Sequence, residues 1–80
     1  MPSTPKANPV QVRLGLAVKT VRKSKAVTQD ELSRRTGLHP TYISDIERGA
    51  RNPSFAVLVR VADGLGINLA ELGAAYDELG

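Results

Sequence analysis

The stretch from Thr28 to Gly49, TQDELSRRTGLHPTYISDIERG, constrains the fold most, because it carries start and stop signals for two short helices. Thr28 and Glu31 have the spacing of a capping box, in which each side chain accepts a hydrogen bond from the other residue's backbone N–H. Gly37 tolerates the left-handed conformation that often ends a helix. These signals predict a helix over residues 29–36.

A second helix is predicted over about residues 40–48. His39 stands at its N-cap position, and Pro40 stands at the first helical position, where the missing N–H costs nothing. Gly49 ends it. Ile43 and Ile46 then face a core and leave the opposite side of the helix exposed. Two helices of this length, joined by a turn containing glycine, match the geometry of a DNA-binding helix-turn-helix.

The run TQDELSRRTGLHPTYISDIERGARNPSFAVLVRVADGLGI resembles the Cro/repressor-type (Xre-like) helix-turn-helix domain, and the resemblance covers roughly residues 10–73. Its markers are Gln29, Gly37, the motif I-S-x-I-E-R-G and the following N-P-S. Within this run, TYISDIERGARNPS is similar to the controller proteins of restriction-modification systems, which are dimeric regulators of about this length. The resemblance implies a transcriptional regulator that binds double-stranded DNA.

Length and composition limit the alternatives. Eighty residues allow one domain with a small core. The sequence contains no cysteine, which excludes disulfides and thiolate metal sites and fits a reducing cytoplasm. We find no apolar run of membrane-spanning length and no signal-peptide pattern, so we expect a soluble, cytoplasmic protein. His39 is the only histidine, and no catalytic group surrounds it in sequence, so we expect no enzyme, cofactor or metal.

Charge is unevenly distributed along the chain. Residues 1–60 contain all 11 Lys and Arg residues and four acidic residues, for a net charge of +7, whereas residues 61–80 contain four acidic residues and carry −4. A basic body favours a polyanionic partner, and the acidic end favours a different contact. Mildly basic small domains are common, so charge alone does not identify a nucleic-acid binder.

The remaining segments complete an all-α fold. Residues 1–8, with two prolines and small polar residues, are expected to form a flexible arm, in which Lys6 is either a DNA contact or part of a solvated tail. Further helices are predicted to start near Pro9, after the cap Ser54 and near Leu69. Gly64 and Gly66 are predicted to end the helix that Ser54 caps. Val10 and Phe55 are placed on buried helix faces. Residues 9–80 are therefore predicted to form a compact five-helix bundle of the lambda-repressor-like type, without strands.

The resemblance also implies site residues. Pro40 stands where phage repressors commonly have a glutamine that contacts adenine, so that contact is absent. Arg22 and Glu47 occupy the positions of a structural ion pair. The base-contacting positions are held by Thr41, Tyr42, Ser44 and Asp45. The phosphate-contacting positions are held by Gln29, Arg35, Arg48, Arg51 and Asn52.

Three of these assignments have alternatives. Tyr42 either contacts DNA or covers the bundle, and Arg35 either reaches a phosphate or belongs to a solvated charged face. Asp45 is an acidic residue that would face the anionic phosphate backbone of DNA. It either accepts a hydrogen bond from a cytosine amino group or disfavours binding and lowers the affinity.

A single domain of this kind contacts few bases, so we expect a homodimer on a palindromic site. Apolar residues of the last helix exceed the needs of a small bundle and are the expected dimer contacts: Leu69, Leu72, Tyr76 and Leu79. Two other functions are considered. The first keeps the domain in another role, either an antitoxin whose acidic C-terminal segment binds a toxin or a DNA-targeting module detached from a longer regulator. The second is a protein-interaction bundle that has lost DNA binding.

Overall fold

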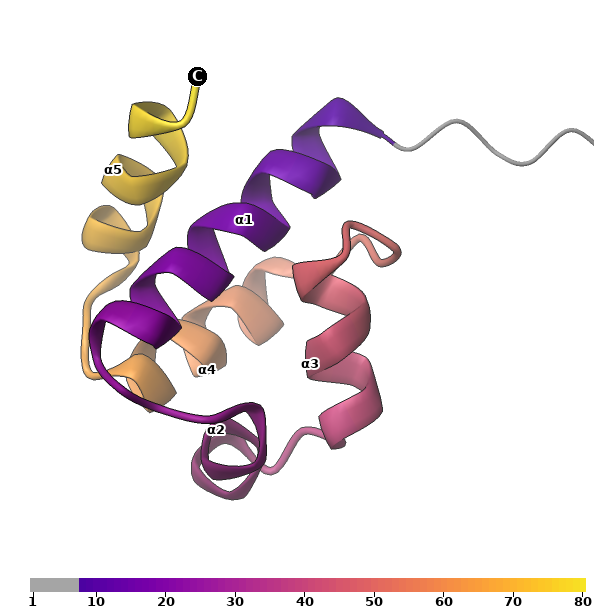
Figure 1. The fold of residues 1–80 in the computed structure, drawn as a ribbon, viewed down its shortest axis with the longest axis vertical. Coiled ribbons are helices and arrows are strands. Elements are labelled where there is room, and N and C mark those ends of the chain that lie inside the picture. Colours follow the sequence, from indigo (N-terminus) through magenta and orange to yellow (C-terminus); the bar gives the residue numbers. More distant parts are fainter. Residues whose placement is uncertain (1–7) are drawn as a thin grey trace, which may run out of the picture.

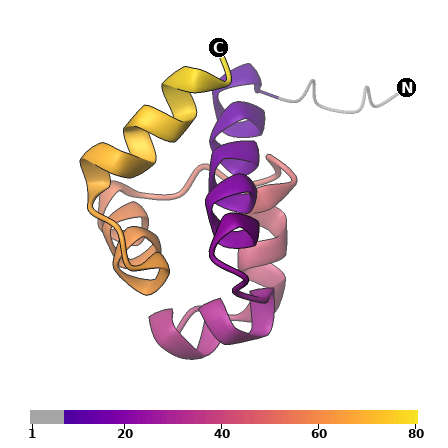
Figure 2. The ribbon, with the colours of Figure 1, turned by 60° about the vertical axis from the view of Figure 1, so that its left-hand side comes forward.

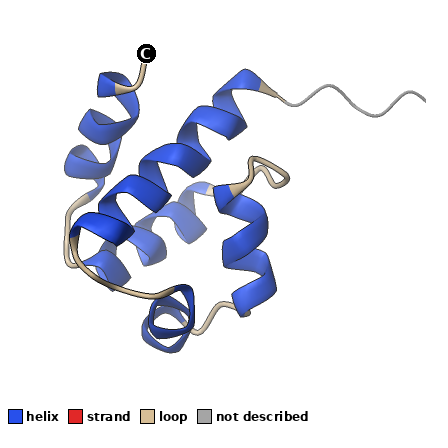
Figure 3. Cartoon of the chain, viewed as in Figure 1, coloured by secondary structure: helices blue, strands red, loops and turns tan. Residues whose placement is uncertain are grey.

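Five α-helices and short connections make up the fold in the computed structural model, which describes residues 8–80 (Figures 1 and 3). The predicted arm, including Lys6, lies outside these residues except for Asn8, whose side chain caps the first helix. The described residues contain no strand. The helices are α1 (Pro9–Ser24), α2 (Gln29–Thr36), α3 (Pro40–Glu47), α4 (Phe55–Leu65) and α5 (Leu69–Glu78).

Local capping signals fix most helix boundaries where the sequence predicted them. Gly37 ends α2 in a left-handed conformation with φ of 75°. The Nδ1 atom of His39 accepts from the backbone N–H of Thr41 at 3.1 Å and so caps α3. Asn68 and Glu71 form a complete capping box at the start of α5. The end of α3 differs by one residue from the predicted one, because Arg48 is the C-cap.

The predicted capping box at Thr28 is only half formed. The hydroxyl of Thr28 accepts from the backbone N–H of Glu31 at 3.0 Å. The carboxylate of Glu31 accepts instead from Arg34 and Arg35, one turn further along α2. A charged donor makes a stronger hydrogen bond to a carboxylate than a backbone N–H does, which accounts for the difference.

The core lies where α1 crosses the other helices. α1 packs against α3, α4 and α5, and α2 packs against α3 and α4. Figures 1 and 2 show α1 running across the middle, with α5 on one side and α3 on the other. The core side chains come from every helix and from two of the connections: Ala17, Val18, Val27, Leu32, Ile43, Ile46, Val61, Ala62, Leu65, Ile67 and Leu72.

Three sequence-based placements are wrong. Phe55 is 69% exposed and is not a core residue, because it is the first residue of α4, at the end of the helix that leads out of the core. Val10 is 59% exposed for the same reason at the start of α1. Gly64 does not end α4 but lies within it, where a Cβ would meet Leu32 and Thr36 of α2.

Gly15 sets the distance between α1 and α3. A Cβ at this position would lie 2.3 Å from the carbonyl oxygen of Ile46 and 2.6 Å from that of Glu47. Backbone atoms cannot move aside as a flexible side chain can. Only glycine therefore lets α1 approach the end of α3 this closely.

We expect Gly15→Ala to lower the free energy of unfolding by about 2 kcal/mol, because the added methyl group forces the two helices apart. Gly73→Ala is the matched control, since a Cβ at the exposed Gly73 of α5 meets nothing within 4 Å. That change should raise stability by about 0.5–1 kcal/mol through helix propensity. Urea denaturation followed by circular dichroism measures both. Equal midpoints for the two variants would contradict the assigned role of Gly15.

Candidate nucleic-acid interface

Helix α3 buries one side and exposes the other. Ile43 and Ile46 are each 1% exposed and hold the inner side in the core. Pro40 and Thr41 at its start are exposed, and Ser44 is half-buried on the outer side. Since these outer residues lie near the N-terminal end of an eight-residue helix, they form a short polar surface that is open to a partner.

The turn between α2 and α3 is held by side-chain hydrogen bonds. The hydroxyl of Ser33 donates to the carbonyl of Leu38 at 2.5 Å. The hydroxyl of Thr36 donates to the carbonyl of Leu32 at 2.8 Å and accepts from the backbone N–H of Leu38 at 3.2 Å. These bonds satisfy the backbone groups of the turn. They fix the angle between α2 and the exposed side of α3.

A buried ion pair joins α1 to α3. Arg22 donates from Nε to Oε2 of Glu47 at 2.6 Å and from Nη2 to Oε1 at 3.0 Å. It also donates from Nη1 to the carbonyl of Val27 at 2.9 Å. The two side chains are 10% and 3% exposed, and the hydrogen bond to Glu47 raises the pKa of Arg22 above its usual range. The structure thus places Arg22 and Glu47 in the contact that the resemblance implies.

Gln29 takes part in the same cluster. Its Nε2 donates to Oε1 of Glu47 at 2.9 Å, so one of its two amide N–H groups is used within the protein. The residue is half-buried at the first position of α2 and borders a surface hollow that Lys23 and Thr28 also line. The backbone N–H groups at this end of α2 favour an anion.

Asp45, on the outer side of α3, is paired with two arginines. Its Oδ1 accepts from Nη2 of Arg48, and its Oδ2 accepts from Nε of Arg51 at 3.3 Å. The hydrogen bond from Arg48, together with that from Arg51, lowers the pKa of Asp45 below its usual range. The Asp45 side chain is only 15% exposed, whereas those of Arg48 and Arg51 are 65% and 56% exposed. The surface that reaches solvent here is therefore cationic.

The guanidinium of Arg51 also lies over an aromatic ring. Its carbon is 5.5 Å from the centre of the Tyr42 ring, within the range of a cation–π contact. Tyr42 is half-buried and packs against the core. It therefore covers the bundle, one of the two predicted alternatives, while it also supports Arg51. Asn52 is exposed in the same loop.

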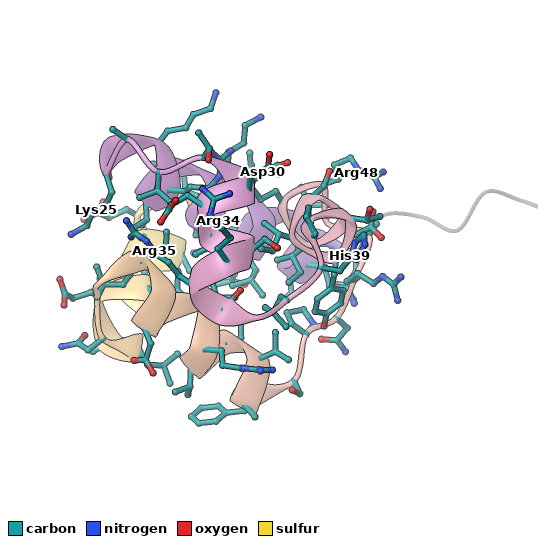
Figure 4. All side chains as sticks on the ribbon, turned by 90° about the horizontal axis from the view of Figure 1, so that it is seen from below. Lys25, Asp30, Arg34, Arg35, His39 and Arg48 are labelled. Atoms are coloured by element: carbon teal, nitrogen blue, oxygen red, sulfur yellow. The ribbon has the colours of Figure 1, made fainter. Side chains whose placement is uncertain are left out.

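Arg35 extends from α2 toward α4. Its Nη1 donates to the carbonyl of Gly64 in α4 at 3.1 Å, and its Nε donates to Glu31 at 3.1 Å. Figure 4 looks onto this end of the bundle and shows Arg34 and Arg35 on α2, with His39 and Arg48 at the two ends of α3. The structure does not bring Arg35 together with Arg48 and Arg51, and it gives this side chain a contact between α2 and α4.

The α5 residues differ in their accessibility. Leu72 is 2% exposed and belongs to the core, so its expected role in a dimer surface is wrong. The staple spacing with Ile67 turns it inward. Leu69 and Tyr76 are half-buried against the core, and Leu79 is 45% exposed. The guanidinium of Arg13 lies 4.2 Å from the Tyr76 ring centre and covers part of that ring.

Comparison with known proteins identifies the family. The HTH_3 family model, described as helix-turn-helix, matches residues 18–72. The chain belongs to the HTH_3 helix-turn-helix family. It is 40% identical over 58 residues to an uncharacterised HTH-type transcriptional regulator, y4dJ, of Sinorhizobium fredii, which covers 72% of this chain and 75% of that protein. It is 39% identical over 66 residues to the control protein C.MunI of a Mycoplasma species, covering 81% and 89%.

A solved structure extends the likeness to the whole fold. The chain superposes on the restriction-modification controller protein C.Esp1396I, whose structure is a tetramer in complex with its natural 35 base-pair operator. The TM-score is 0.81 at 27% identity, and the match covers 90% of this chain and 96% of that one. The family and fold are those of DNA-binding transcriptional regulators rather than enzymes.

No helix within residues 8–80 is long and apolar enough to cross a membrane. The same part of the chain holds no group of three or more His, Cys, Asp or Glu side chains that is arranged to bind a metal ion.

Sequence reasoning missed two contacts of this helix-turn-helix protein. The pairing of Asp45 with Arg48 was available from their spacing of three residues, which brings opposite charges together on a helix. Arg13 donates from Nε to the carbonyl of Tyr76 at 2.8 Å and so binds the end of α5. That contact joins residues 63 positions apart, and no local pattern indicates it.

We expect Glu47→Gln to lower the free energy of unfolding by about 3–5 kcal/mol, because it leaves the buried Arg22 without a counter-charge. The double variant Arg22→Met, Glu47→Leu should lose much less stability than the single variants Arg22→Met and Glu47→Leu lose when their losses are added, since it buries no unpaired charge. Thermal unfolding by calorimetry measures the cycle. Glu31→Ala is the control, because it removes ion pairs that are exposed and should leave the midpoint nearly unchanged. Additive single effects would show that the pair is not coupled.

Proposed function

We propose that this transcriptional regulator acts as a homodimer that binds a palindromic site in double-stranded DNA. In this proposal α3 enters the major groove, where a helix fits and where base pairs are distinguishable. The observation that carries the proposal is the division of α3 into two sides. Ile43, Ile46 and Glu47 hold its inner side, and a short polar surface faces outward at its N-terminal end.

Base contacts are assigned to the start of α3. Thr41 is exposed there and offers both a hydroxyl group and a methyl group that can contact thymine. Ser44 lies one turn later and Tyr42 between them, and both are half-buried. The N-terminal residues of a recognition helix contact base edges in this family of docking geometries. Thr41 is therefore the residue expected to contribute most to sequence preference.

Phosphate contacts are assigned to groups around the C-terminal end of α3. Arg48 and Arg51 lie there, and their side chains are more than half exposed. Gln29 begins α2, where helix N–H groups favour a phosphate, and its side chain contacts Glu47, the last residue of α3. Phosphate contacts of this kind would fix the register of the helix on the duplex without reading sequence. The solved operator complex of C.Esp1396I supports this arrangement by analogy, because that protein shares the fold.

The two roles predict different mutant behaviour. Thr41→Ala should relax the preference at one base pair in each half-site, at a cost of about 1–3 kcal/mol for the preferred base. Arg51→Ala should weaken binding to all duplexes alike and should reduce the slope of log K against log salt by about one. Selection of bound sites from random duplexes, followed by fluorescence anisotropy at several salt concentrations, measures both. An exchange of the two outcomes would refute the assignment. Tight binding without salt dependence would refute the function.

The dimer contact is assigned to the side of the bundle that α4 and α5 form together (Figure 2). Leu79, the C-cap of α5, is 45% exposed, and the half-buried Leu69 and Tyr76 add to the apolar surface of that helix. Phe55, the first residue of α4, is also exposed. A two-fold dimer would present its two α3 helices about 34 Å apart, which is one turn of DNA.

We expect Leu79→Glu to weaken dimerisation at least about tenfold, because a charge at an apolar contact loses its hydration. Leu16→Glu is a matched control, since Leu16 has almost the same exposure, 46% against 45%, but lies on α1. Sedimentation equilibrium measures both dissociation constants. If Leu16→Glu dissociates the dimer and Leu79→Glu does not, the contact is on α1. A wild-type monomer at high micromolar concentration would rule out the dimer.

A further inference from the structure

Asp45 presents a conflict of charge, since an acidic side chain stands on the side of α3 that we assign to DNA. The sequence left two interpretations: a base contact through cytosine, or a repulsive group that lowers affinity. The first interpretation needs a carboxylate that is available to a base, and the second needs a negative charge that neighbouring groups do not neutralise. In the structure, both carboxylate oxygens already accept hydrogen bonds from guanidinium groups, and the side chain is only 15% exposed.

We propose that Asp45 is a positioning residue that holds Arg48 and Arg51 in place for phosphate contact. This inference rests on the proposed DNA-binding function. The two arginines belong to different segments: Arg48 is the C-cap of α3, and Arg51 lies in the loop before α4. Asp45 binds each of them through a different oxygen, so one carboxylate sets the separation of the two guanidinium groups.

Arg51 is held from a second direction by the Tyr42 ring, over which its guanidinium lies at 5.5 Å. Tyr42 itself packs against the core and cannot move far. The loop is also tied to α3 by the backbone, because the N–H of Ala50 donates to the carbonyl of Asp45 at 2.9 Å. Arg51 is therefore placed by a carboxylate, a ring and its own backbone.

The arginines remain able to bind a phosphate while Asp45 holds them. A guanidinium has five N–H groups, and the structure uses one from each arginine for Asp45. Their side chains are 65% and 56% exposed, so the other N–H groups face solvent. The three groups together carry a net charge of +1. A phosphate that approaches this surface meets the two guanidinium groups and not the carboxylate beneath them.

Two effects of opposite sign decide what loss of Asp45 does to DNA affinity. Removal of a negative charge favours binding, but this charge is paired, and salt screens it over a Debye length of about 8 Å. Release of two long side chains disfavours binding, because each must then be ordered again when DNA binds. That ordering corresponds to roughly a threefold to tenfold loss of affinity for each side chain. Ordering is the larger effect, so loss of the carboxylate should weaken binding.

The test is the DNA affinity of Asp45→Ala and Asp45→Asn for a palindromic duplex selected from random sequence, measured by fluorescence anisotropy. We expect both variants to bind about fivefold or more weakly than wild type, with an unchanged base preference at every position. In an Arg48→Ala, Arg51→Ala background, Asp45→Ala should instead bind slightly more tightly, because only the repulsion remains to be removed. The effect of Asp45→Ala on DNA affinity thus changes sign when the two arginines are absent. A purely structural role of Asp45 would weaken binding in both backgrounds.

Two outcomes would overturn the proposal. Tighter binding by Asp45→Ala in the otherwise wild-type protein would make Asp45 a repulsive group. A changed preference at one base pair would make it a base contact. Side-chain NMR gives a readout that needs no DNA: the Nε–Hε signals of Arg48 and Arg51 should become more mobile in Asp45→Asn, while circular dichroism stays the same. If the wild-type protein binds no duplex, the proposed function fails. The positioning role is refuted separately if Arg48 and Arg51 are equally mobile in wild type and in Asp45→Asn.

Discussion

The buried contact between Arg22 and Glu47 is the interaction on which the helix-turn-helix depends. Glu47 is the last residue of α3, Arg22 lies in the last turn of α1, and Gln29 begins α2, so three helix ends meet at one carboxylate. Apolar packing sets the distance between helices but leaves their rotation loosely determined. A bidentate guanidinium–carboxylate pair has a fixed geometry, and therefore it also fixes the rotation of α3.

Two acids of the motif, Glu31 and Asp45, follow one pattern. Glu31 on α2 is paired with Arg34 and Arg35, and Asp45 on α3 is paired with two arginines of its own. Each carboxylate thus leaves one surplus positive charge in its cluster. A surface that includes acids is consequently cationic where it meets solvent, and its guanidinium groups are held apart rather than free to move. For Arg48 and Arg51, which we assign to phosphate contact, this ordering would lower the cost of binding DNA.

Helix boundaries were predictable from sequence because capping is a local interaction. His39, Gly37 and Asn68 act on backbone groups within a few residues, so their effect is visible in a short window. The errors at Phe55 and Leu72 have a different origin. A helical pattern gives the side of the helix on which a residue lies, but not whether a neighbouring helix extends far enough to cover it. The placement of Asp45 beside Arg51 likewise depends on the path of a loop, which the sequence pattern does not specify.

Helix α3 is too short to form alone, because eight residues cannot repay the cost of helix nucleation in water. It exists through Ile43, Ile46 and Glu47, which the rest of the bundle holds. The residues assigned to DNA are carried on the same two turns. Stability and the proposed recognition therefore share one element: a change at Gly15 or Arg22, which contact α3 from α1, is expected to rotate or loosen the surface that we assign to DNA. Loss of DNA affinity in such a variant reports a displaced helix rather than a lost contact.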